Sequence, residues 1–75
     1  MSVYTDEIEI GSTYRVYGRM GKMRRFAPMN GEGGFAVNLI YALLFTIKTE
    51  VEQEQLRKEL EFLNTQGEFK LKKVV

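Results

Sequence analysis

The longest apolar run of the chain spans residues 35–47, with the sequence FAVNLIYALLFTI. At a period of two, its odd positions are all apolar and its even positions are mixed. This alternation predicts a central strand, covered on one face and partly covered on the other. Because no glycine or proline occurs between residues 35 and 66, a competing interpretation stays open, in which residues 38–42 form a short helix or turn.

A β-hairpin is predicted for residues 13–29, which contain two β-compatible segments separated by Gly21 and Lys22. Glycine at the first position of a two-residue loop is typical of a type II′ turn. With this turn, Tyr17 lies opposite Phe26. One face of the hairpin is then mostly apolar and is expected to meet the core. The other face carries arginine and aromatic side chains. The glycine-rich residues 30–34 that follow are expected to be a flexible loop, either a simple connection or a mobile flap.

An amphipathic helix is predicted from Thr49 to Gln66. Thr49 and Glu52 have the spacing of a capping box, in which the threonine hydroxyl accepts from the Glu52 amide and the carboxylate accepts from the Thr49 amide. Leucines at positions 56, 60 and 63 give the helix one buried face. Gly67 is expected to end the helix in a left-handed conformation.

Val51 and Phe62 form a second apolar stripe on the predicted helix. At 100° per residue they point within about 20° of each other and well away from the leucine face. Either the sheet wraps widely around the helix, or the stripe contacts another protein chain. These two residues are therefore candidates for a protein interface, including that of a homodimer, which would stabilise so small a domain.

The last segment, residues 68–74, alternates between apolar and charged positions. Phe69 and Leu71 are expected to face the core and Lys70 and Lys72 the solvent, which predicts a half-buried strand. The fold class is therefore α+β, with an antiparallel sheet of three to four strands and one helix packed on one face. The expected order is strand, strand, strand, helix, strand. We interpret residues 1–75 as a single domain, with residues 1–12 partly irregular.

Composition argues against catalysis and cofactor binding. The chain has no cysteine and no histidine, so it lacks a thiolate nucleophile, an imidazole base and the usual zinc ligands. The glycines near position 33 match no phosphate-binding motif. We therefore expect no enzyme activity, no catalytic residues, no cofactor and no metal. The apolar run is shorter than the roughly 20 residues of a membrane span, and the acidic N-terminal segment predicts no targeting sequence. We expect a cytoplasmic protein without membrane contact.

Charge is unevenly distributed, although the formal net charge is only +1. Basic residues without an intervening acid occupy the predicted hairpin, and its solvent face interleaves them with aromatic side chains. Such surfaces hold single-stranded nucleic acids, because bases stack on aromatic rings and cations neutralise phosphate. Lys70 and Lys72 would extend the surface if the last strand joins the same sheet. The candidate nucleic-acid-binding residues are Arg15, Tyr17, Arg19, Lys22, Arg24 and Phe26.

The segments YRVYGRMGKMRRFAPMNG and NLIYALLFT, followed by a charged helix and EFKLKKV, resemble small uncharacterised α+β proteins encoded by bacterial phages and mobile elements. The resemblance covers residues 13–74 and implies an accessory binding role, but it identifies no site residue. The expected function is therefore that of a small accessory protein acting through protein–protein contacts. The alternative is single-stranded nucleic-acid binding by the hairpin face.

Overall fold

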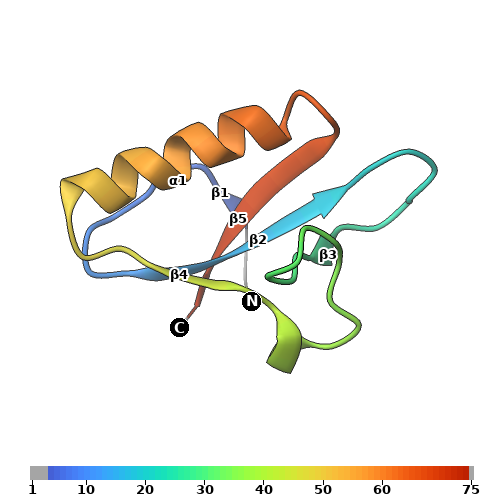
Figure 1. Cartoon of the computed structure of the whole chain (residues 1–75), viewed down its shortest axis with the longest axis horizontal. Helices are drawn as coiled ribbons and strands as arrows, with labels where there is room; N and C mark the ends of the chain where they lie inside the picture. The colour runs from blue at the N-terminus through green and yellow to red at the C-terminus, as the bar shows by residue number, and fades with distance from the viewer. Residues whose placement is uncertain (1–3, 75) are drawn as a thin grey trace.

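The chain folds as an antiparallel β-sheet with one α-helix lying over it, as the computed structural model in Figure 1 shows. The structure describes residues 4–74. Residues 1–3, part of the segment expected to be partly irregular, lie outside them. The predicted α+β class is confirmed, although the sheet has five strands rather than three or four. In chain order the elements are β1 (Tyr4–Thr5), β2 (Thr13–Arg19), β3 (Ala27–Pro28), the 3₁₀ helix η1 (Leu39–Tyr41), β4 (Leu44–Thr46), α1 (Glu50–Leu63) and β5 (Glu68–Val74).

Strand β2 is the centre of the sheet. It pairs with β5 along its full length, from Thr13 opposite Val74 to Arg19 opposite Glu68. Its other edge is shared by β3 and β4, and β1 lies outside β5. The prediction that residues 35–47 form the central strand is therefore wrong. The long strands β2 and β5 come from the segments with strict alternation of polar and apolar positions.

Residues 35–47 are divided by a local hydrogen bond of Asn38. Its side-chain oxygen accepts from the amide of Ile40 at 2.9 Å and caps η1. Asparagine side chains compete in this way with the sheet for backbone donors. Only β4 remains extended enough to pair with β2. Residues 39–41 form the 3₁₀ helix η1, so the competing interpretation of a short helix or turn is confirmed. Val37 and Ile40 are 93% and 79% exposed.

The predicted hairpin turn is present, but the register of the hairpin is different. The amide of Met23 donates to the Met20 carbonyl at 3.1 Å, and Gly21 has a φ of 57°, which suits the first position of a type II′ turn. Tyr17 lies opposite Pro28 instead of Phe26, because the residues after the turn leave the ladder. Since the shift is two residues, the side chains keep their predicted faces.

Helix α1 begins with the predicted cap and ends earlier than predicted. The Thr49 hydroxyl accepts from the Glu52 amide at 3.3 Å. The Glu52 carboxylate accepts from the amide of Lys48 at 3.0 Å rather than from that of Thr49. The helix ends at Leu63, so the terminal turn predicted up to residue 66 is not helical.

Asn64, not Gly67, ties the end of α1 to β5. The Asn64 side chain accepts from the Phe69 amide at 2.9 Å and donates to the Phe69 carbonyl at 3.2 Å. Gly67 has no positive φ, so its predicted left-handed conformation is wrong. Glycine is required there for close packing, because a Cβ atom would lie 2.6 Å from the carbonyl oxygen of Arg19.

The core lies between α1 and one face of the sheet. Figure 1 shows the helix running above this face. The Tyr14 hydroxyl, at the centre of the core, accepts from the Glu9 amide at 2.8 Å. Leu56 is the fully buried residue of α1. None of the helices within residues 4–74 is long and apolar enough to cross a bilayer. The buried side chains are Ile8, Tyr14, Val16, Ile47, Leu56, Phe69 and Leu71.

Candidate nucleic-acid interface

The site begins with the alternation of β2, which directs its side chains to opposite faces of the sheet. Tyr14, Val16 and Gly18 are buried beneath α1, whereas the intervening residues are only partly covered. Arg15, Tyr17 and Arg19 therefore lie on the sheet face opposite the helix. If the helix covered this face, the predicted nucleic-acid surface would be buried. Because α1 packs on the other face, the surface is left uncovered.

Strand β5 adds two lysines to the same face. Lys72 lies opposite Arg15 and Lys70 lies opposite Tyr17. Directly opposed residues of an antiparallel pair point to the same side. Strand β1 extends this arrangement, since Tyr4 lies opposite Lys72. We call the resulting surface the open face. Its residues are Tyr4, Arg15, Tyr17, Arg19, Phe26, Lys70 and Lys72.

Three aromatic rings form a continuous cluster on the open face. The ring centroid of Tyr4 is 5.9 Å from that of Tyr17 and 5.1 Å from that of Phe26. Tyr4 belongs to β1 at one edge of the sheet, and Phe26 directly precedes β3 at the other edge. The extended loop of the hairpin therefore brings Phe26 back across the sheet, where it packs on a residue distant in sequence.

Cations lie over the rings of this cluster. The ammonium nitrogen of Lys72 is 4.8 Å from the ring centroid of Tyr4 and 4.6 Å from that of Tyr17. Arg19 and Lys70 lie over Phe26, at 4.8 and 5.8 Å from its centroid. An exposed cation–π contact contributes only about 0.5–1 kcal/mol. Because these cation–π contacts are weak, the three cations can leave the rings to form a stronger interaction with an anion.

Only part of the positive charge on the open face is compensated. Arg19 donates to both carboxylate oxygens of Glu68, at 3.1 Å each. Its other terminal nitrogen donates to the carbonyl of Arg24 at 3.2 Å. Arg15, Lys70 and Lys72 form no ion pair within residues 4–74. The Nε of Arg15 is also buried without a hydrogen-bond partner in this part of the chain. These three cations are the ones left for an anionic ligand.

Tyr4 remains neutral at physiological pH. Burial raises the pKa of its hydroxyl, and the neighbouring Tyr17 raises this pKa further. A phenol with an ordinary pKa near 10 is already protonated at pH 7. The Tyr4 ring therefore places no negative charge among the lysines.

The structure brings together four of the six predicted nucleic-acid-binding residues: Arg15, Tyr17, Arg19 and Phe26. Lys22 and Arg24 are exposed on the hairpin loop, and Arg24 is linked to the cluster through its carbonyl group rather than its side chain. Sequence reasoning missed Tyr4, whose place depends on the pairing of β1 with β5. It also missed the neutralisation of Arg19 by Glu68.

The predicted protein interface lies on a different surface. Val51 and Phe62 are 65% and 58% exposed on the outer side of α1. The sheet does not wrap around the helix to cover them, which rules out the first explanation of this stripe. The second explanation, contact with another protein chain, stays a prediction.

No family model, curated protein or solved structure matches this chain.

Proposed function

We propose that this protein binds single-stranded nucleic acid on the open face. The proposal depends on one observation: three aromatic rings lie among uncompensated cations on the sheet face that α1 leaves uncovered. Unpaired bases stack on aromatic side chains, and lysine or arginine side chains contact the phosphates between them. Duplex bases offer no free faces for such stacking, so single strands are the preferred ligand.

On binding, the Lys72 ammonium group would leave the rings of Tyr4 and Tyr17 and contact a phosphate of the nucleic acid. Stacking of a base on an aromatic side chain contributes about 1–3 kcal/mol, more than the exposed cation–π contact it replaces. A base that stacks on Tyr4 or Tyr17 therefore displaces the ammonium group from the ring. The displaced group lies beside the backbone of the bound strand, where it pairs with a phosphate.

Affinity for a single strand should fall steeply as salt rises. With Arg15, Lys70 and Lys72 as phosphate contacts, the slope of log K against log salt concentration is expected to be about −2, because each contact contributes roughly −0.7 on single strands. Fluorescence anisotropy of labelled oligothymidylate and oligouridylate measures this slope, with a duplex of equal length as the control. Absence of binding at low salt, or equal affinity for the duplex, would contradict the proposal.

We also propose a protein contact through Val51 and Phe62, because both side chains are exposed on the outer side of α1. If this stripe joins two copies of the chain, the wild-type protein sediments as a dimer and Phe62→Asp sediments as a folded monomer. Val51 and Phe62 lie on the opposite side of the sheet from the aromatic cluster, so the substitution should leave oligothymidylate binding unchanged. A wild-type protein that stays monomeric at high concentration would refute the homodimer.

A further inference from the structure

Strand β4 has an unpaired outer edge. Among residues 4–74 it pairs only with β2. The amides of Leu43 and Ile47 donate inward, to the carbonyls of Met29 and Ser12, both at 2.9 Å. Because main-chain groups alternate in direction along an antiparallel strand, those of the two even positions, 44 and 46, point away from the sheet. Their amides and carbonyls are available to another strand.

This edge lacks two of the features that usually protect the edges of sheets. Proteins guard such edges with proline, charged side chains or very short strands. Strand β3 contains Pro28, and β1 is only two residues long. Strand β4 is also short, with three residues, but its sequence LFT contains neither proline nor charge, and Leu44 is 51% exposed. An exposed sheet edge without proline or charge can accept an extended peptide as an added strand.

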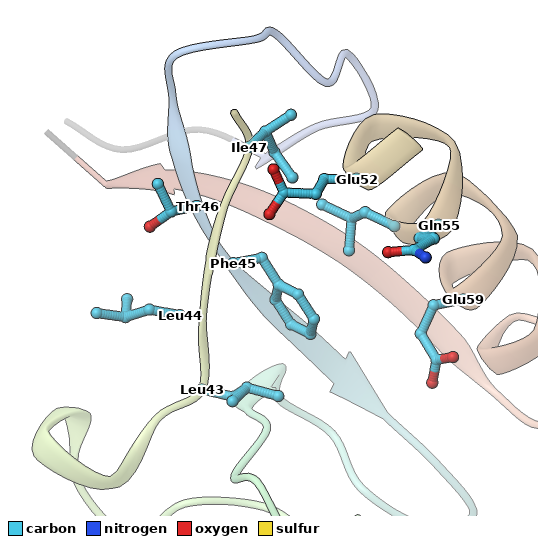
Figure 2. Close-up of a pocket in the computed structure, with 9 residues that line it drawn as sticks. Leu43, Leu44, Phe45, Thr46, Ile47, Glu52, Gln55 and Glu59 are labelled. Atoms are coloured by element: carbon cyan, nitrogen blue, oxygen red, sulfur yellow. The ribbon is translucent and has the colours of Figure 1, made fainter. Parts of the chain in front are cut away.

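A groove of about 460 Å³ runs beside this edge, between β4 and α1. Figure 2 shows Leu43, Phe45 and Ile47 pointing from the strand toward the helix, while Leu44 and Thr46 point to the other side. The helix contributes polar side chains to the rim of the groove. The lining residues from α1 are Glu52, Gln55, Leu56 and Glu59.

The charge of the groove indicates the chemistry of its occupant. Glu52 and Glu59 are the charged lining residues, and they lie about 10 Å apart along the helix axis. Glu59 forms no ion pair in the described part of the chain. A second copy joined edge to edge would bring its own acidic rim to this region. A basic partner is therefore favoured over self-association.

We propose that β4 binds an extended basic peptide of a partner protein as an added antiparallel strand. Every second side chain of such a peptide faces the groove. A basic, an apolar and a second basic residue at these positions span about 13 Å, enough to pair with Glu52 and Glu59 on either side of the apolar floor formed by Phe45. The intervening residues direct their main-chain groups to β4. This surface lies at the edge of the sheet and does not depend on nucleic-acid binding by the open face.

The test uses a fluorescein-labelled peptide with the core Lys-Thr-Val-Thr-Lys, flanked by serines, and the full protein. The valine and lysines face the groove, and the threonine amides face β4. Methylating both threonine amides should weaken binding at least about tenfold, because two hydrogen bonds are lost. Methylating the valine amide, which points away from β4, should leave the affinity unchanged. Equal loss with both methylations, or no binding of the parent peptide, would overturn the added-strand geometry.

A pair of protein variants tests the charge pairing. Glu59→Lys should weaken peptide binding at least about tenfold, since it places like charges together. Glu61→Lys changes the net charge equally at an exposed helix position that does not line the groove, and should bind as the wild type does. Circular dichroism verifies that both variants fold. Equal weakening by both, or a wild-type dimer through β4 that excludes the peptide, would overturn the proposal.

Discussion

Gly18→Ala is expected to lower the free energy of unfolding by about 2 kcal/mol, within the roughly 1–3 kcal/mol typical of overpacking. A Cβ atom at Gly18 would overlap the ring carbons of Phe69. That ring cannot simply move away, because it is buried and stacked on Phe35 with ring centroids 6.5 Å apart. The hydrophobic core of a domain of this size supplies a net stability of only about 3–5 kcal/mol. Urea denaturation followed by circular dichroism measures the change.

Gly31→Ala is the matched control for this substitution. Gly31 has no positive φ, and a Cβ there meets only Leu43 at an ordinary 3.8 Å, so its unfolding midpoint should change little. Phe69→Leu should cost less free energy in the Gly18→Ala background than in the wild type, because the two sites contact each other. The packing of Gly18 against Phe69 would be contradicted if the two substitutions lower the free energy of unfolding additively. It would also be contradicted if Gly18→Ala unfolds with the same free energy as the wild type.

Replacing Arg15, Lys70 and Lys72 together by alanine is expected to weaken oligothymidylate binding by two to three orders of magnitude at about 50 mM salt. Each phosphate contact on a single strand contributes roughly eightfold at that concentration, from the release of counterions. The salt dependence should nearly vanish in this variant. Fluorescence anisotropy across a salt series measures both effects.

A second triple variant controls for net charge. Lys48, Arg57 and Lys58 carry the same total charge and lie outside the open face, immediately before or within α1. Replacing these three by alanine should leave the affinity within about twofold, since exposed charges beyond a Debye length are largely screened. If the two triple variants lose affinity equally, binding is a general effect of charge and the open face is not its site.

The faces of the sheet could be predicted from sequence because strict alternation fixes which side chains point together. The pattern of residues 13–19 and 68–74 correctly separates Tyr14 and Leu71 from Arg15 and Lys72. The helix cap at Thr49 is equally local and is also confirmed. Such features depend on residues a few positions apart, whose geometry is fixed by the backbone period.

Features that depend on contacts between distant segments could not be predicted. The apolar content of residues 35–47 fits a strand as well as a turn, and the structure forms the turn, where the Asn38 side chain accepts a hydrogen bond from the Ile40 amide. The position of Tyr4 depends on pairing with β5, nearly the whole chain away. The hairpin register changes because Phe26 packs across the sheet rather than in the ladder. Tertiary packing, not local preference, determines each of these.

The most direct test of binding at the open face is a heteronuclear NMR titration of the protein with short oligothymidylate at low salt. We expect amide shifts to concentrate in β2 and β5, with changes in the ring resonances of Tyr4, Tyr17 and Phe26, while the outer side of α1 is unaffected. Shifts confined to α1 and β4, or no shifts at all, would contradict nucleic-acid binding by this surface.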